Sequence, residues 1–214
     1  MEERTRGPAE QPNFGPPSTP RPAASVVLLR RGGRHGERAL EVLLLRRSAE
    51  AKFMPGVWVF PGGAVDPTDG EGEPGYRACA ARELAEEAGI ELPAGEELVL
   101  FSRWITPEVI STRFDAWFFL ALAPAHTPPA PDGVETTDAA WFRPAAALET
   151  QAAGELTLAF PTISQLESLL PFSSSEEALA AHRDRPVEPI LPKVIGESRE
   201  EARVVLPGDP DYPD

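Results

Sequence analysis

The sequence predicts a mixed α/β domain in which a β-sheet lies between helices. Three observations support this class. Apolar β-type runs fill the first third of the chain, one strongly patterned helix follows them, and further strands then lead into several helices. This order is typical of a domain built from one sheet with helices on its faces, followed here by an extended C-terminal segment.

Each element follows from a local signal. Two apolar runs joined by the turn-forming segment 32–38 predict a β-hairpin, and a short strand ends at Pro61-Gly62-Gly63. The turn-rich segment 64–75 precedes the patterned helix, which ends at Gly89 because glycine readily adopts the left-handed conformation that closes a helix. The predicted strands are 23–31, 40–47, 57–60, 96–105, 113–123 and 139–144; the later predicted helices are 144–153, 162–170 and 175–183; and the tail 189–214 holds two short strands around a polar turn.

Proline distribution divides the chain. Of its 214 residues 25 are proline, and these gather at the two ends and in the connection at 124–131. We therefore predict a disordered, Pro-rich N-terminus over residues 1–22, a folded central domain over 23–156, and a C-terminal extension of helical and extended structure over 157–214. The tail contains two short apolar runs with prolines beside them. They would form either an arm that contacts the second subunit of a homodimer or a cover for the protein's own sheet edge.

Composition excludes several classes of protein. The net charge of −14 disfavours nucleic-acid binding, which depends on neutralising phosphates. No apolar run is long enough to cross a membrane, and residues 1–20 lack the apolar segment of a signal peptide. A single cysteine, Cys79, excludes an internal disulfide. We expect a soluble, cytoplasmic protein with a small-molecule ligand and with neither nucleic acid nor membrane as partner.

Three glutamates mark the patterned helix as a candidate site. Glu83, Glu86 and Glu87 stand at i, i+3 and i+4, which places them on one helix face. Such a cluster destabilises an isolated helix, but carboxylates are the ligands that Mg²⁺ prefers. The opposite face carries residues at core spacing, namely Ala81, Leu84, Ala85 and Ala88.

The segment "RELAEEAGI" resembles the second half of the Nudix box, whose pattern is G-x5-E-x7-R-E-U-x-E-E-x-G-U with U apolar. Seven fixed positions match: Arg82, Glu83, Leu84, Glu86, Glu87, Gly89 and Ile90. The first half differs, because 18 residues separate Gly63 from Arg82 where the pattern has 13. Pro74 consequently stands at the upstream glutamate position, with Glu73 beside it. With "FMPGVWVFPGG", "WITPE" and "RFDAWFFLALAP", this extended loop is similar to the Nudix subgroup that includes a mammalian peroxisomal coenzyme A diphosphatase.

The resemblance implies a fold, a cofactor and a set of site residues. The fold would be a Nudix-type α/β/α sandwich with a mixed sheet, and the cofactor Mg²⁺ or Mn²⁺. The implied metal ligands are Gly62, Glu83, Glu86, Glu87 and Glu135, and the implied catalytic residues are Glu83 as first choice of general base, Arg82 and Glu86. Glu86 and Glu135 remain alternatives for the base. Candidate substrate-binding residues are Arg46, Arg47, Gly63, Trp104 and Arg113.

The implied activity is Mg²⁺-dependent cleavage of a diphosphate bond in a nucleoside diphosphate linked to another moiety. A coenzyme A-like substrate is suggested by Arg47, Ser48 and Gly56, although Ala51, Met54 and Val57 depart from that signature. Pro107, 17 residues past Ile90, hints at an ADP-ribose-like substrate instead. A mutagenic nucleotide is a third alternative. A Nudix-fold sensor that binds a nucleotide without cleaving it is the alternative from another class, and such proteins typically lack the acids that this chain retains.

Overall fold

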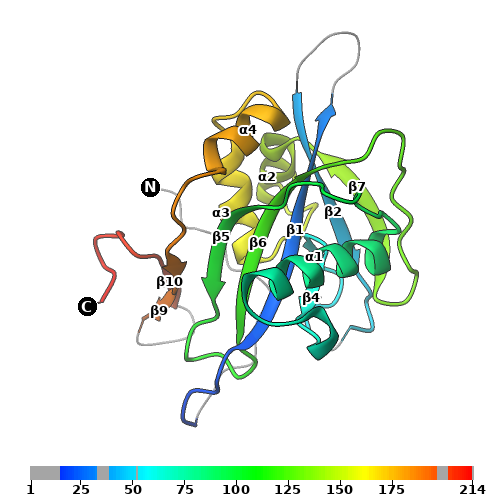
Figure 1. Cartoon of the computed structure of the whole chain (residues 1–214). Helices are drawn as coiled ribbons and strands as arrows, with labels where there is room; N and C mark the ends of the chain where they lie inside the picture. Colours follow the sequence, from blue (N-terminus) through cyan, green and yellow to red (C-terminus); the bar gives the residue numbers. More distant parts are fainter. Residues whose placement is uncertain (1–14, 33–38, 52, 197–201, 214) are drawn as a thin grey trace.

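A mixed β-sheet with helices on both faces forms the framework of the molecule (Figure 1). The computed structural model describes residues 15–32, 39–51, 53–196 and 202–213. The strands in these residues are β1 (Arg21–Gly32), β2 (Ala39–Arg47), β3 (Trp58–Val59), β4 (Gly62–Ala64), β5 (Val99–Ile105), β6 (Phe114–Leu122), β7 (Thr136–Phe142), β8 (Pro189–Ile190), β9 (Lys193–Ile195) and β10 (Arg203–Val205).

The helices divide between the two faces of the sheet. They are the 3-10 helix η1 (Pro67–Asp69) and the α-helices α1 (Gly72–Ala88), α2 (Pro144–Ala152), α3 (Phe160–Leu169) and α4 (Ser175–His182). Figure 1 shows α1 across one face, with α2, α3 and α4 on the other. Gly89 ends α1 as predicted: its φ of 63° is left-handed, and its N–H donates to the carbonyl of Ala85.

Within the described residues, eight strands form one sheet in the order β3-β2-β1-β6-β5-β8, with β4 paired to β1 and β7 to β2. The pairs β1–β6 and β5–β8 are parallel, and the others are antiparallel. A separate two-stranded ribbon contains β9 and β10. The predicted α/β class with a mixed sheet between helices is confirmed.

Two apolar cores explain why the central strands are apolar throughout. Val27 and Leu29 of β1 point into the core under α2, α3 and α4, whereas Val26 and Leu28 point into the core under α1. A strand covered on both faces cannot alternate apolar with polar residues, because the polar side chains would then all be buried on one of the two faces. The uninterrupted "VVLL" of β1 follows from this position.

Several short elements were not predicted from the sequence. β4, η1 and β8 are only two or three residues long, and the two strands exist because a neighbouring strand pairs with them. β1 begins at Arg21, two residues before the predicted domain boundary. The antiparallel β1–β2 pair confirms the predicted hairpin, although residues 33–38 of its turn lie outside the described residues.

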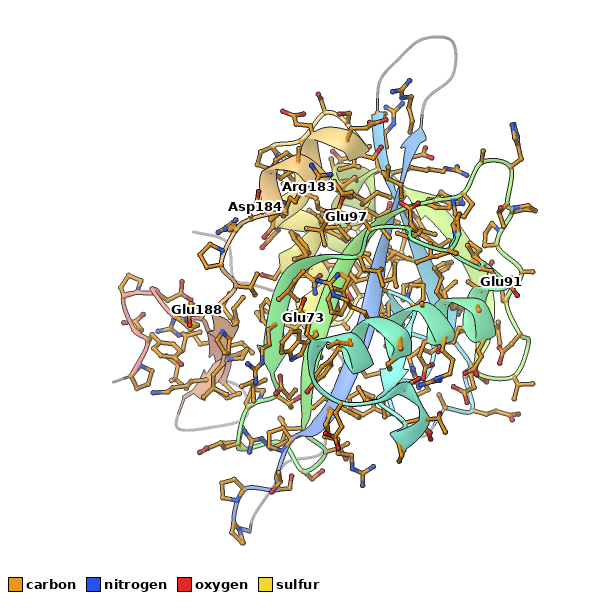
Figure 2. All side chains as sticks on the ribbon, viewed as in Figure 1. Glu73, Glu91, Glu97, Arg183, Asp184 and Glu188 are labelled. Carbon is orange, nitrogen blue, oxygen red and sulfur yellow. The ribbon has the colours of Figure 1, made fainter. Side chains whose placement is uncertain are left out.

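The C-terminal extension is packed onto the rest of the chain. Leu166 and Leu179, from α3 and α4, belong to the same core cluster as β1 and β2. The ion pair of Arg183 with Glu97 adds a surface link at 2.8 Å between the end of α4 and the segment before β5 (Figure 2). The helical part of the extension therefore contributes to one continuous core. No helix in the described ranges is long and apolar enough to cross a membrane.

Candidate active site

The three glutamates of α1 have very different environments. The helix rests on the sheet through Cys79, Ala80, Leu84 and Ala88, so successive side chains pass from the core to the surface as the helix turns. The side chain of Glu83 is 13% exposed and that of Glu86 is 60% exposed, whereas Glu87 as a whole residue is only 4% exposed. Ala81 and Ala85, predicted to face the core, are only half-buried. The glutamate cluster thus reaches from solvent into the protein interior.

Arg82 connects the acids of this helix. Its Nη1 donates to Glu83 Oε1 at 2.8 Å and to Glu86 Oε2 at 3.0 Å. Its Nε and Nη2 donate to the two carboxylate oxygens of Asp69 at 2.9 and 2.8 Å. One guanidinium group therefore holds three carboxylates.

Asp69 was missed by the sequence analysis, which searched for an acid eight positions before Arg82. Pro74 and Glu73 are at and next to that position, and Glu73 pairs with Arg77 instead. Asp69 lies in η1, inside the extended loop, where its carboxylate also accepts the backbone N–H of Asp66 in a capping box. The sequence Asp66-Pro67-Thr68-Asp69 is a recognisable capping signal, and it could have located this turn.

Two glycines allow the backbone to approach the acids closely. The N–H of Gly62 donates to Glu87 Oε2 at 2.9 Å. A Cβ atom on Gly63 would lie 2.4 Å from Glu83 Oε1, and one on Gly62 would lie 2.1 Å from Ser25 Oγ. Any side chain at either position would therefore collide with its neighbours. The two glycines are explained by the packing of β4 between β1, which Gly62 approaches, and α1, which Gly63 approaches.

Burial raises the pKa of both inner glutamates. For Glu87 the pKa rises to about 7, chiefly through desolvation, with the negative charge of Glu83 adding to it and the Gly62 N–H opposing it. Burial likewise raises the pKa of Glu83, while Arg82 opposes that shift. The hydrogen bonds from Arg82 instead hold the pKa of Asp69 below its usual value. Burial therefore favours the protonated form of Glu83 and Glu87, whereas Asp69 is held in its charged form.

The loop before β7 brings another acid to this place. The carboxylate of Asp132 accepts the backbone N–H groups of residues 134, 135 and 136, which forms a tight turn. The hydroxyl of Thr136 lies 2.8 Å from the carbonyl of Glu87 at the end of α1. Glu135, predicted as a late-loop ligand, is thereby placed in the same cleft as the α1 glutamates, together with Asp132, which the sequence analysis did not select.

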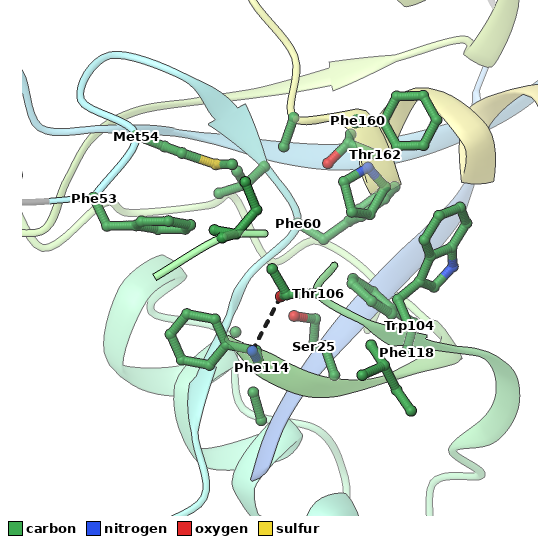
Figure 3. A pocket seen from close by; sticks show the side chains of 18 of the residues that line it. Ser25, Phe53, Met54, Phe60, Trp104, Thr106, Phe114, Phe118, Phe160 and Thr162 are labelled. Carbon is green, nitrogen blue, oxygen red and sulfur yellow. Dashed lines mark hydrogen bonds between the residues drawn. The ribbon is translucent and has the colours of Figure 1, made fainter. Parts of the chain in front are cut away.

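These acids line one part of a cleft of about 1570 Å³. The remainder of its wall is largely aromatic and aliphatic (Figure 3). Trp104 contacts Phe160 edge-to-face with 6.0 Å between ring centroids, and Phe53 contacts Phe114 in the same way at 5.9 Å. An acidic region and a large apolar region thus share one cavity.

The predicted substrate-binding residues separate into two groups. Arg47, Gly63 and Trp104 line the cleft, and Arg47 also donates from Nε to the carbonyl of Phe53 at 3.0 Å. Arg46 and Arg113 do not line the cleft. Arg46 is exposed outside the cleft lining, because adjacent residues of β2 point in opposite directions.

Arg113 is buried, and its side chain donates hydrogen bonds to backbone carbonyl groups. Its guanidinium donates to the carbonyl of Thr106 at 2.9 Å and to that of Ser18 at 2.7 Å, which fixes the loop between β5 and β6 and the segment before β1. Arg21, at the start of β1, is a cleft-lining cation that the sequence analysis did not select. The alternation of side chains along a strand could not identify Arg21 as a cleft residue, because Arg21 is the first residue of β1.

The residues present fit a hard divalent cation. They supply carboxylate oxygens from one helix and one loop, and two of the carboxylates have a pKa raised by burial, so a cation would relieve their repulsion. As the side chains of the described residues stand, no three acids, histidines or cysteines converge into a closed metal cage. The physical reason is that Arg82 engages Glu83 and Glu86 while the Gly62 N–H engages Glu87.

The family model of the NUDIX domain matches residues 19–160, which is most of the chain. The chain belongs to the Nudix hydrolase superfamily. It is 24% identical to the acyl-coenzyme A diphosphatase NUDT19 of Xenopus laevis over 81% of this chain and 72% of that protein. A stretch of 70 residues is 46% identical to nudix hydrolase 7 of Caenorhabditis elegans, covering 33% of this chain and 22% of that relative, so the chain spans about a fifth of its length.

A solved structure agrees with this membership of the Nudix superfamily. The crystal structure of a NUDIX hydrolase from Alicyclobacillus acidocaldarius superposes with a TM-score of 0.69 at 27% identity. The match covers 79% of this chain and 99% of that one. The Nudix fold expected from the box residues is confirmed, including its mixed sheet and its flanking helices.

Proposed function

We propose that this Nudix protein is a Mg²⁺- or Mn²⁺-dependent hydrolase that cleaves the diphosphate bond of a nucleoside diphosphate linked to a second moiety. The observation that carries the proposal is the composition of the cleft, where Glu83, Glu86, Glu87 and Glu135 line the same cavity as a large apolar surface. A diphosphate with its metal ion needs the acidic part of the cleft, and a large substituent on the diphosphate would bind to the apolar part.

The acids would hold the metal, with the Gly62 carbonyl as a further ligand. The bound ion supplies charge neutralisation on the diphosphate and a more acidic water molecule. Arg82 fixes the side chains of Glu83 and Glu86, so the two ligands are oriented before substrate arrives. Arg47 and Arg21, which line the same cleft, would contact the phosphates.

Glu83 is the proposed general base. It lies at Gly63 on the cleft wall, and Arg82 holds one of its carboxylate oxygens while the other is free to accept a proton from water. Glu135 is the alternative, because the Asp132 turn presents it from the facing loop. The variants Glu83→Gln and Glu135→Gln would distinguish them, since loss of the base removes the acidic limb of the pH–rate profile.

Among the three substrate classes, a coenzyme A-type compound fits the cleft best. A cavity of about 1570 Å³ exceeds the 300–1,000 Å³ that is typical for pockets holding drug-sized ligands. The apolar wall would suit the pantetheine arm and an attached group better than the second ribose of an ADP-ribose-like compound. The diphosphatase activity in the name of the Xenopus relative supports the same class.

The test is hydrolysis of a panel of diphosphates with products identified by mass, with Mg²⁺ and with a chelator. Wild type should release 3′,5′-ADP-type products from coenzyme A compounds only when Mg²⁺ is present. Glu86→Gln should lower turnover about 100-fold or more, because it removes an anionic ligand but preserves size. Glu91→Gln is the matched control, since Glu91 is exposed just beyond the end of α1 and outside the cleft lining (Figure 2).

Three outcomes separate the hypotheses. Mg²⁺-dependent cleavage that Glu86→Gln abolishes and Glu91→Gln retains supports the hydrolase. Cleavage of ADP-ribose or of modified nucleoside triphosphates in preference to coenzyme A compounds would retain the hydrolase and overturn the substrate class. Tight binding of a nucleotide with no cleavage of any compound would instead support the non-catalytic sensor.

A further inference from the structure

The C-terminal ribbon of β9 and β10 forms part of the wall of the active-site cleft. Val194 and Val204 are directly paired across the two strands, so their side chains lie on the same face of the ribbon. Both valines line the cleft and are partly exposed. The neighbouring Val205 points the other way and is buried. The ribbon therefore presents the paired valines to the cavity, with the exposed Arg203 beside them in the cleft lining, and buries Val205 on its other face.

One contact joins the segment before the ribbon to the sheet, and two contacts fold the C-terminal tail onto the ribbon. β8, just before it, pairs with β5, where Ile190 lies beside Trp104. The Tyr212 hydroxyl donates to the carbonyl of Leu191 at 2.7 Å, and Arg203 pairs with Asp211 at 2.6 Å. Strand pairing and a folded-back terminus fix the ribbon as a wall of the cleft, with a defined orientation towards the cavity.

The ribbon and the acids lie next to different strands of the sheet. α1 packs on β1 and β4, whereas the ribbon follows β8 at the outer edge beyond β5 (Figure 1). Apolar residues of the β5–β6 connection extend the same wall. Val109 is 45% exposed at its rim, next to Ile110 in the cleft. A substrate whose diphosphate lies at α1 would extend its other end towards these side chains.

We propose that the β9–β10 ribbon is the subsite for a linear acyl group carried by the substrate, so that Val194 and Val204 make the enzyme prefer acylated over free coenzyme A. This inference rests on the proposed function. Each methylene that is removed from water makes the free energy of binding more favourable, which corresponds to about fourfold in affinity per fully buried methylene. The C-terminal extension is then a specificity element of the active site.

The experiment measures binding and cleavage separately. Free coenzyme A and its acetyl, butanoyl, hexanoyl and octanoyl thioesters are titrated calorimetrically with a chelator present, and kcat/KM for the same series is measured with Mg²⁺. Wild type should bind the octanoyl compound at least tenfold more tightly than free coenzyme A. The double variant Val194→Asn/Val204→Asn should bind free and octanoyl coenzyme A with nearly equal affinity, because an amide at this wall must be desolvated when the chain binds.

Leu170→Asn is the matched control, since Leu170 is 50% exposed and lies outside the cleft lining. It should retain the full dependence on chain length. Circular dichroism and thermal melting establish that each variant is folded. Should the asparagine variant unfold, Val194→Ala/Val204→Ala is used instead, and a reduced increment is then expected.

The outcomes distinguish this inference from the proposed function. A wild-type protein whose affinity does not rise with chain length overturns the subsite, as does a double variant that keeps the increment. Chain-length-dependent binding that the valine variants abolish, in a protein that cleaves no compound, supports the subsite and overturns the hydrolase. Cleavage of free and acylated coenzyme A at equal kcat/KM retains the hydrolase and overturns the subsite.

Discussion

Asp69 and Arg82 form a two-pronged ion pair in which Nε and Nη2 of the arginine donate to the two carboxylate oxygens at 2.9 and 2.8 Å. The Asp69 side chain is almost completely buried in this contact. The pair fixes the guanidinium, and its remaining Nη1 then reaches Glu83 and Glu86. An aspartate from the extended loop thereby orients two residues of the candidate metal site.

Asp69→Asn should lower kcat more than it changes KM, because it alters the orientation of ligands while leaving the substrate contacts in place. The expected loss is about 10- to 100-fold, as is typical for residues that orient metal ligands. Asp69→Glu should recover part of the rate by restoring the charge. Steady-state kinetics with Mg²⁺ measures both parameters.

The matched control for this prediction is Glu73→Gln, the acid nearest the expected box position, which pairs with Arg77. It should leave kcat unchanged. Equal losses in the Asp69 and Glu73 variants would show that the loop acids act only through stability.

Glu87→Gln should stabilise the protein above neutral pH when no divalent metal is present. The pKa of Glu87 is about 7 in the folded protein and 4.5 without its environment. Between these values the unfolded chain ionises while the folded protein stays protonated, so wild-type stability falls as pH rises. The full effect is about 3 kcal/mol, and it is absent below pH 4.5.

The measurement is urea unfolding of wild type and Glu87→Gln from pH 4 to pH 8 in a chelator. The difference in unfolding free energy should grow across pH 4.5–7 and then level off. Glu91→Gln, at an exposed position, should show no such growth. A difference between wild type and Glu87→Gln that stays constant over this range would contradict the raised pKa.

The thiol of Cys79 should not react with thiol reagents in the folded protein. Cys79 is fully buried between α1 and the sheet, and burial raises its pKa to about 12, to which the nearby charges of Glu83 and Asp69 contribute. Because it is the one cysteine of the chain, the result is unambiguous. Titration with a disulfide reagent at pH 8 should give one thiol in urea and almost none in buffer; rapid reaction in buffer would show that α1 opens.

Deletion of residues 1–20 should destabilise the protein by about 1–3 kcal/mol, the usual cost of leaving a buried donor unsatisfied. The deletion removes the Ser18 carbonyl that accepts from the buried Arg113 guanidinium. Deletion of residues 1–14 keeps this acceptor and is the matched control. Urea unfolding of the two proteins measures the difference, and equal stability would show that water replaces Ser18.

The sequence predicted those parts of the fold that depend on long local patterns. β1 and β2 contain long apolar runs and appear within two residues of the predicted bounds. α1 ends where predicted but begins at Gly72, inside the segment 64–75 that was predicted as a turn, because glycines and a proline at its start hide the first turn of the helix. β4 and β8 have too few residues for a pattern, and they are strands because β1 and β5 are beside them. Such elements depend on contacts between distant parts of the chain, which one sequence does not reveal.

The candidate site was predictable to the extent that its residues share one helix. Spacing places Glu83, Glu86 and Glu87 on one helix face, and the resemblance to the Nudix box makes them candidate metal ligands. Asp69 could not be found by counting, because the extra residues of the loop move the acid to a new position along the chain. Arg46 and Arg47 are equivalent in composition, but only one of two adjacent strand residues can point into the cleft.

The pairing of β1 with β6 also determines when the protein can fold. Arg21–Leu29 align with Phe114–Leu122, so the middle of the sheet joins segments from opposite halves of the chain. During synthesis β1 emerges early, with apolar residues on both faces and one edge unpaired until β6 has been made. A nascent chain in this state can pair with other chains. Leu166 and Leu179 complete the core under α2, α3 and α4 later still, so this core cannot close before the last helices have been made.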